Sequence, residues 1–302
     1  MKGYTGVVAV FAAVAFAGGA AGQPGTPDQS PLTMAEVLAA APDGDWRAPD
    51  AENTVYFEFG SGRVVIELAP AFAPDHARNI RALVRAGYFD GASVVRSQDN
   101  YVVQWGRTEE APAETGDAKP SLPGEYARPI GDDLPFTALP DPDSYAPRTG
   151  FSAGFPAARD PATGLTWLVH CYGMVGAGRG MAADSGSGAE LYTVIGHAPR
   201  HLDRNVTLVG RVVSGVELLS VLPRGTGPLG FYEDPGRFVP ILRARIAADV
   251  PEAERTKIEL LRTDSPSFAA LIEARRTRRE EWFIEPTGHI EVCNVPLPTR
   301  TP

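Results

Sequence analysis

The chain has 302 residues, of which 43% are hydrophobic, so it can bury a core of ordinary composition in one large domain or two small ones. Its formal net charge of −9 argues against a nucleic-acid partner, because proteins that bind phosphate backbones usually carry a basic surface. The 32 glycines and 28 prolines predict many turns and loops rather than a helix bundle.

The N-terminus has the pattern of an export signal. Lys2 is followed by an apolar run over 7–22 that ends in small residues, which predicts a signal peptide at 1–22 cleaved before Gln23. An uncleaved anchor is the alternative, although the run is short for a membrane span. We therefore expect a periplasmic or secreted protein without stable membrane insertion after cleavage.

Two cysteines, Cys171 and Cys293, are present in the whole sequence. An exported chain meets an oxidising compartment, so a disulfide between them is possible. Two separate thiols agree with the sequence at least as well, because spacing alone does not decide the pairing.

An N-terminal extension at 23–52 is rich in proline, aspartate and alanine. A short helix is predicted at 33–41, where Thr33 is followed three positions later by a glutamate, as in a capping box. The segments 54–59 and 63–68 then alternate apolar and other residues and are joined by Gly-Ser-Gly, which predicts a β-hairpin.

The next segment, 73–91, predicts an amphipathic helix. Pro74 suits its first turn, its apolar residues fall on one stripe, and Gly87 suits its end. Two strands are predicted to follow, at 93–97 and 101–105.

Residues 107–165 are rich in proline, aspartate and glycine, and we expect a long, partly ordered loop insertion there. Strand-like patterns return afterwards, with a helix at 214–222 between the last two. These strand-like segments are 165–176, 190–196, 206–213 and 240–248. About eight short strands and two helices without a βαβ rhythm predict a mainly β fold: a closed eight-stranded antiparallel β-barrel capped by two helices.

The remaining residues predict a C-terminal helical extension. The stretch 265–283 has a helical pattern capped by Ser265, and its basic run is interpreted as a solvated helix face. A short extended piece is predicted at 291–298. The predicted layout is a signal peptide at 1–22, an N-terminal extension at 23–52, a barrel at 53–248 that contains the 107–165 insertion, and an extension at 249–302.

Several common catalytic motifs are missing from the sequence. The glycine-rich stretch 175–190 has no GxGxxG and no Walker lysine, which argues against a nucleotide site. The histidines are scattered, and Pro199 between His197 and His201 prevents a metal-binding helix of the HExxH type. No pair of carboxylates suggests glycosidase chemistry. We therefore predict no cofactor and no metal.

An arginine and a glutamine interrupt two apolar strands. Arg96 follows two valines, and Gln104 shares a strand face with Val102. These two residues alone favour an edge arginine that reaches water with the glutamine beside it. A functional role is the alternative, and the order of the surrounding segments supports it.

That order resembles the cyclophilins, over roughly 54–247 of the chain. A hairpin, a helix ending in Gly-Tyr-Phe-Asp-Gly and a strand with an arginine are followed by Tyr-Val-Val-Gln-Trp-Gly, as in that family. The matching stretches are LAPAFAPDHARNIRAL, GYFDG, VVR, NYVVQWG, GMVGAGRG, SGSGAELYTVIG and HLDRNVTLVGRVVSGVELLSVL. Each stretch is weak alone, but their shared order is hard to obtain by chance.

The resemblance implies peptidyl-prolyl cis–trans isomerisation. It assigns catalysis to Arg96, with Gln104 orienting the arginine and touching the substrate backbone. It implies a proline pocket and a groove for the preceding residue, the latter lined by Gly178 and Arg179. The positions implied for the pocket are Tyr101, Val102, Tyr192, His201, Leu202 and Val206.

The sequence departs from the family's pattern at several of these positions. Val102 stands where the family has a methionine, Val206 where it has a histidine, and His201 where some members have a tryptophan. Val95 replaces the histidine before the arginine, and Glu190 replaces a glutamine. The smaller side chains predict a shallower pocket, with weaker activity or a different preference for proline contexts.

We expect an exported, monomeric prolyl isomerase that acts on unfolded or flexible proline-containing polypeptides and assists the folding of exported proteins. The rival interpretation is a catalytically silent or weak barrel that binds peptides as a chaperone or interaction module. A third interpretation, an unrelated ligand-binding barrel, has no pocket signature in the sequence.

Overall fold

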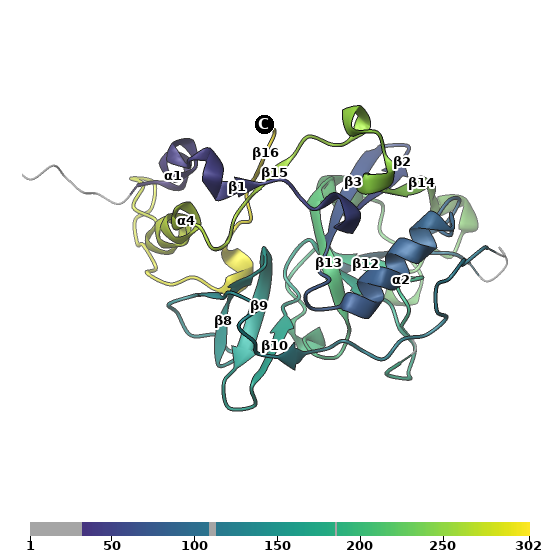
Figure 1. Ribbon diagram of the computed structural model, residues 1–302, viewed down its shortest axis with the longest axis horizontal. Helices are drawn as coiled ribbons and strands as arrows, with labels where there is room; N and C mark the ends of the chain where they lie inside the picture. The colour runs from purple at the N-terminus through teal and green to yellow at the C-terminus, as the bar shows by residue number, and fades with distance from the viewer. Residues whose placement is uncertain (1–31, 109–112, 185) are drawn as a thin grey trace, which may run out of the picture. The chain divides into compact units, whose positions relative to one another are not determined.

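Eight antiparallel strands close into a barrel in the computed structural model of the chain, which describes residues 32–108, 113–184 and 186–302 (Figure 1). Around the barrel the order is β11 (Met174–Ala177), β12 (Leu191–Val194), β5 (Val102–Gly106), β4 (Ser93–Ser97), β14 (Val239–Ile246), β2 (Thr54–Phe59), β3 (Gly62–Leu68) and β13 (Leu208–Ser214). Strand β13 pairs with β11 and closes the ring. The predicted mainly β fold with an eight-stranded antiparallel barrel is confirmed.

The β2–β3 hairpin shows how the alternating sequence builds the barrel interior. Phe57 of β2 and its cross-strand partner Val64 of β3 are both buried in the main core with Trp105 of β5. The opposite face of the hairpin is also buried, since Tyr56 and Val65 pack in a second cluster that includes residues after β14. The C-terminal extension therefore covers a face that alternation alone would leave to water.

Two helices of the barrel region lie where the sequence predicted them. Helix α2 (Pro74–Arg85) buries Ile80 and Leu83 in the main core, and α3 (Val216–Ser220) buries Leu219 there. The short 3-10 helices are η1 (Asp43–Asp45), η2 (Ala51–Asn53), η3 (Arg200–Leu202), η4 (Pro228–Gly230), η5 (Pro235–Arg237), η6 (Ala247–Asp249), η7 (Glu252–Glu254) and η8 (Val292–Asn294).

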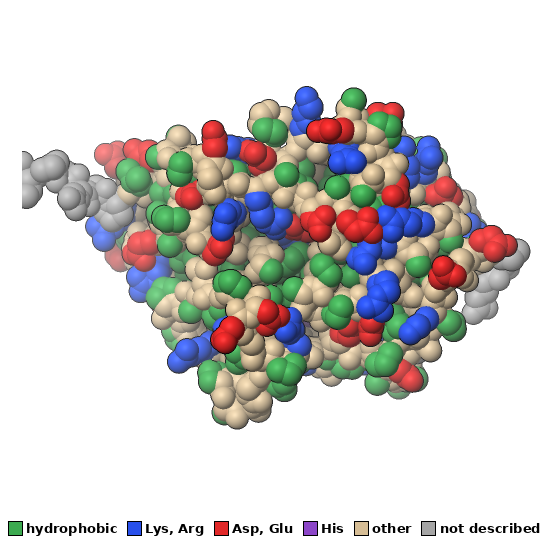
Figure 2. Space-filling view, viewed as in Figure 1, with side chains coloured by type: hydrophobic (Ala, Val, Ile, Leu, Met, Phe, Trp, Pro, Cys, Tyr) green, Lys and Arg blue, Asp and Glu red, His purple; other side chains and the backbone are tan. Residues whose placement is uncertain are grey.

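The outer face of α2 is polar. Arg85 of this helix pairs with Glu52 at 2.8 Å and with Asp249 at 2.9 Å. Basic and acidic side chains are interspersed on the face that Figure 2 shows. That face therefore lacks the single-sign basic field that phosphate backbones require.

Three distant parts of the chain form a second packed region, which we call the side lobe: residues 32–47, 128–168 and 259–300. Its elements are α1 (Met34–Ala40), β1 (Trp46–Arg47), β6 (Arg128–Pro129), β7 (Thr137–Ala138), β8 (Arg148–Ser152), β9 (Phe155–Asp160), β10 (Leu165–Leu168), β15 (Glu259–Leu261), α4 (Pro266–Thr277) and β16 (Thr299–Arg300). They make a five-stranded sheet, β6-β10-β9-β8-β7, and a three-stranded sheet, β1-β15-β16. The rings of Phe151 in β8 and Phe268 in α4 meet edge to face at 4.9 Å, which ties the insertion to the C-terminal extension.

The insertion is thus more regular than its proline content suggests, and several element boundaries differ from the predictions. The stretch 165–176 is divided, with β10 in the side lobe and β11 in the barrel. Helix α4 is capped by Ser265 as predicted but ends at Thr277, because Arg278 takes a left-handed conformation with φ of 45°. The predicted capping box of α1 is present between Thr33 and the glutamate three positions on.

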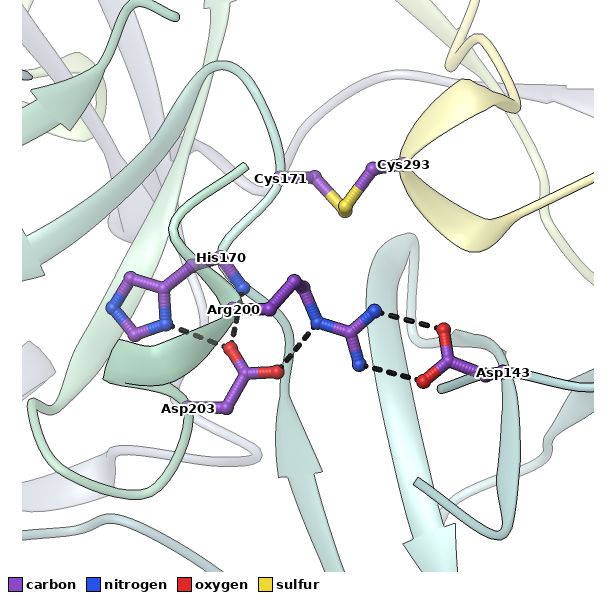
Figure 3. The surroundings of a disulfide bond; sticks show 6 residues. All are labelled: Asp143, His170, Cys171, Arg200, Asp203 and Cys293. Carbon is purple, nitrogen blue, oxygen red and sulfur yellow. Dashed lines mark hydrogen bonds and ion pairs between the residues drawn. A yellow bond between two sulfur atoms is a disulfide. The ribbon is translucent and has the colours of Figure 1, made fainter. Parts of the chain in front are cut away.

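Cys171 and Cys293 form a disulfide, a pairing that the sequence left undecided (Figure 3). It joins the loop between β10 and β11 to η8 of the C-terminal extension, with the two Cα atoms 4.9 Å apart. The packing of the side lobe against the barrel brings the two sulfur atoms together. No local sequence pattern predicts this long-range packing.

No helix among the described residues is both long and apolar enough to cross a bilayer. The predicted signal peptide at 1–22 lies outside the described residues.

Replacing both cysteines by serine should lower the stability of the protein. The bond closes a long loop of 122 residues, and its loss leaves the unfolded chain with more freedom, so we expect a loss of about 2–4 kcal/mol in urea unfolding. A reducing agent should shift the unfolding midpoint of the wild type but not that of the C171S/C293S variant. A wild-type midpoint that does not respond to reductant would contradict the assignment.

Candidate active site

The candidate site is built around Arg96, whose strand β4 pairs with β5. In the β4–β5 register Arg96 lies directly opposite Gln104, and its Nη1 donates to Gln104 Oε1 at 3.1 Å. The arginine residue is half-buried, so its side chain does not extend freely into water.

Two further acceptors hold the same guanidinium. Its Nε donates to the Leu229 carbonyl oxygen at 2.7 Å, and its Nη2 donates to Gln98 Oε1. Leu229 lies in η4 with a left-handed φ of 57°, a conformation that is uncommon for leucine and that places its carbonyl at the arginine. Of the five N–H donors of an arginine, three have partners among the described residues, so two are left for a ligand.

Aromatic rings flank the guanidinium. Its Cζ lies 5.7 Å from the centre of the Tyr101 ring and 5.4 Å from that of Phe231, within the range of cation–π contacts. Partial burial lowers the pKa of Arg96, but an arginine keeps its proton in proteins. The site thus presents a fixed, partly desolvated positive charge.

An apolar cluster lies beside this charge. In the β5–β12 register Tyr192 lies opposite Gln104 and Val194 lies opposite Val102. Because alternate residues share a face, these side chains lie on the same face of the two strands. Val102, Tyr192 and Val194 are buried together, with Tyr101 and Val206 packed against them.

The remaining predicted pocket residues form the edge of the cluster. The His201 ring stacks on Tyr101 with centroids 6.3 Å apart and an angle of 4° between planes. Leu202 accepts a hydrogen bond from the Val206 backbone N–H at 3.2 Å and is half-buried.

Gln104 connects the arginine to a carboxylate. Its Nε2 donates to Glu190 Oε2 at 2.8 Å, while its Oε1 faces Arg96. This orientation is required, because the guanidinium only donates and the carboxylate only accepts. Gly178 is adjacent, since a Cβ built there would lie 3.6 Å from Gln104 Nε2. Arg179 instead turns its Nε to the Asn205 carbonyl oxygen at 2.9 Å and is exposed.

The Tyr192 ring lies across Gly176, its partner on β11. A Cβ at residue 176 would lie 2.3 Å from Tyr192 Cζ, so the absence of a side chain there makes room for the ring. The hydroxyl of Tyr192 lies 2.9 Å from His170 Nε2, and burial is the main cause that raises the pKa of this tyrosine.

The structure therefore brings most of the predicted site residues together, although their roles stay predictions. Sequence reasoning missed Gln98, Leu229, Phe231 and His170. The sequence could have indicated Gln98, because it follows Arg96 by two residues, the spacing at which side chains share one face of a strand. The other three, Leu229, Phe231 and His170, come from segments far from Arg96 in the chain, where no local pattern indicates them. Among the described residues, no group of three or more histidine, cysteine, aspartate or glutamate side chains could hold a metal ion.

Comparisons with known proteins agree on one family. The family model described as "Cyclophilin type peptidyl-prolyl cis-trans isomerase/CLD" matches residues 54–245. A protein of Brucella suis named probable peptidyl-prolyl cis-trans isomerase is 25% identical over 213 residues, which cover 67% of this chain and 86% of that protein. Human peptidyl-prolyl cis-trans isomerase-like 1 is 32% identical over 101 residues, 33% of this chain and 56% of its own length.

A solved structure extends the likeness beyond the barrel. The crystal structure of a cyclophilin from Hirschia baltica superposes with a TM-score of 0.68 at 27% sequence identity. The match covers 89% of this chain and 97% of that one, more of the chain than the family model does.

Substituting alanine for Gly176 should disturb the site. The new methyl group would overlap the Tyr192 ring, and we expect the free energy of unfolding in urea to fall by about 1–3 kcal/mol. Gly60→Ala is the matched control, because a Cβ there meets nothing within 4 Å, and its effect should stay within about 0.5 kcal/mol. Equal stabilities of the two variants would show that the ring does not lie across residue 176.

Proposed function

The chain belongs to the cyclophilin-type peptidyl-prolyl cis–trans isomerase family, and from this premise we propose that Arg96 catalyses the isomerisation. The observation that carries the proposal is the geometry around this residue: a guanidinium fixed by three acceptors, with two donors to spare, beside an apolar cluster. The chain is an isomerase of peptidyl-prolyl bonds, and the proposal concerns how its own residues perform the reaction.

The reaction breaks no covalent bond. The barrier of roughly 18–20 kcal/mol arises because rotation about the peptide C–N bond removes its resonance. In the twisted state the prolyl nitrogen regains a localised lone pair, which accepts a hydrogen bond far better than the planar amide does. A donor placed at this nitrogen therefore stabilises the transition state more than the ground state.

Arg96 has the features of such a donor. Gln104, Gln98 and the Leu229 carbonyl fix its position before the substrate arrives, so little reorganisation is needed during the rotation. The aromatic rings on its flanks restrict water, which strengthens the electrostatic effect of the charge.

The apolar cluster of Val102, Tyr192 and their neighbours is the proposed site for the proline ring. The ring is held there while the acyl side of the bond rotates past Arg96. Gln104 faces both the guanidinium and Glu190, and we propose that it orients the arginine and contacts the substrate backbone. We propose that Gly178, His201 and Leu202 line the rim of the same site.

We propose that the substrates are unfolded or flexible proline-containing segments of other exported proteins, and that the protein works as a monomer in the periplasm or outside the cell. The signal-like pattern at 1–22 supports export. The Cys171–Cys293 disulfide supports an oxidising compartment, where such bonds persist.

A catalytically weak or silent peptide-binding module is the second candidate. The specific observation in its favour is the pair of small side chains, Val102 and Val206, at positions where the family has a methionine and a histidine. A shallower proline site weakens substrate binding, but it leaves the arginine and its three acceptors in place.

Replacing Arg96 by alanine should lower kcat/KM for a proline-containing peptide by at least about 30-fold, equivalent to about 2 kcal/mol of transition-state stabilisation. The measurement is a protease-coupled or NMR exchange assay. Arg96→Lys should recover little of this loss, because an ammonium cannot satisfy three acceptors in the planar arrangement of a guanidinium. Arg78→Ala is the control, because this arginine makes an exposed ion pair with Asp75 on α2, and it should keep wild-type activity.

Equal rates for the wild type and R96A, both no faster than the uncatalysed reaction, would refute catalysis by this site. Peptide binding that survives in such a protein would then support the binding-module alternative.

A further inference from the structure

A fully buried histidine lies directly behind the proposed proline site. His170 follows β10, and both of its ring nitrogens have partners. Nε2 lies 2.9 Å from the Tyr192 hydroxyl, and Nδ1 lies 2.9 Å from Asp203 Oδ1, which also accepts from the His170 backbone N–H at 3.0 Å. The isomerase chemistry does not use this residue, so its burial needs another reason.

The partners of His170 fix which way its hydrogen bonds run. An ionised Asp203 carboxylate only accepts, so Nδ1 carries the ring proton and donates to it. In the neutral imidazole, Nε2 is then an acceptor, and the Tyr192 hydroxyl donates to it. Burial lowers the pKa of His170, which favours this neutral form.

The chain of contacts continues into the side lobe (Figure 3). Asp203 Oδ2 accepts from Arg200 Nε at 2.7 Å, and the two terminal nitrogens of Arg200 donate to the carboxylate of Asp143 at 2.8 and 3.0 Å. All three side chains are nearly inaccessible to solvent. Asp143 belongs to the insertion, where it also accepts from the Tyr145 and Ala146 backbone N–H groups.

We propose that His170 is a positioning residue for the isomerase: it holds the Tyr192 ring in place as one wall of the proline site. Asp203 and Arg200 set the position of His170 and connect it to Asp143 of the side lobe. This inference rests on the proposed function, because it assigns Tyr192 to the binding of proline. It gives the insertion a role in substrate affinity.

The surroundings of Tyr192 explain why its ring needs a hydrogen-bond partner to fix its position. Its ring lies over Gly176, which offers no side chain to hold it, and its buried hydroxyl needs a hydrogen-bond partner. Without His170 the hydroxyl would have to turn toward water, and the ring would leave the apolar cluster that it forms with Val102 and Val194.

A positioning role makes a specific kinetic prediction. Tyr192 contacts the proline ring in the ground state and in the transition state alike, so loss of its position should weaken binding without changing the rotation step. In His170→Phe, KM for a proline-containing peptide should rise about fivefold, within the range of one net hydrogen bond, while kcat stays within about twofold of the wild type. An NMR titration with the same peptide should show the matching change in Kd.

A double-mutant cycle tests whether the effect passes through the tyrosine hydroxyl. Tyr192→Phe should raise Kd by a similar factor, and the H170F/Y192F variant should be no worse than either single variant. His170→Gln keeps one acceptor and one donor and should return Kd to within about twofold of the wild type. Asp143→Asn, in the side lobe, should raise Kd in the same direction as H170F but by a smaller factor.

Controls separate this role from a general loss of stability. Leu83→Ala removes buried atoms from α2, away from this chain of contacts, and should lower stability while leaving Kd unchanged. Should H170F fail to fold, Y192F and D143N decide the question, because both are close in shape to the wild type.

Two outcomes would overturn the inference. The first is an unchanged Kd in folded H170F, or, if H170F does not fold, an unchanged Kd in both Y192F and D143N. The second is a double variant whose effect on Kd equals the sum of the two single effects in free energy. Both leave the proposed function standing if R96A still lowers kcat/KM by about 30-fold or more. Conversely, a fully active R96A would refute the proposed function, while the Kd values would still report on His170.

Discussion

The site depends on one constraint: a charged guanidinium must be held still at the surface of the barrel. The Arg96 guanidinium is held by acceptors on β5, at the end of β4 and in η4, so three separate segments of the chain fix its position. The β4–β5 pairing supplies the first contact by placing Gln104 opposite Arg96, and the β5–β12 pairing then places Tyr192 beside them. The charge and the apolar cluster are neighbours because the register of three strands makes them so.

The side lobe supports the proposed proline site through the contacts of His170. It is assembled from both ends of the described chain and from the insertion, and the Cys171–Cys293 bond fixes the loop that carries His170. A buried ion-paired network of this kind adds little to stability by itself, because desolvation offsets the attraction of the charges. Its value lies in fixing orientation, and here it ends on a residue of the proposed proline site.

Local patterns in the sequence predicted the elements that depend on interactions between residues close together in the chain. The hairpin at 54–68, the cap of α1 by Thr33 and the apolar stripe of α2 each depend on residues close together in the chain, and all are present. Arg96 and Gln104 could be paired in advance because their strands are consecutive. By contrast, the Leu229 carbonyl lies 133 residues from Arg96, and the partners of His170 are Tyr192 of β12 and Asp203 after η3. Contacts of this range depend on closure of the barrel, so periodicity and spacing do not reveal them.

A crystal structure with a short proline-containing peptide tests the central claim most directly. The account predicts that the proline ring lies against Val102 and Tyr192, with a terminal nitrogen of Arg96 within about 3.5 Å of the prolyl amide and the contacts to Gln104 and Leu229 intact. A peptide bound at another face of the barrel, or bound here with the guanidinium turned away into solvent, would contradict it.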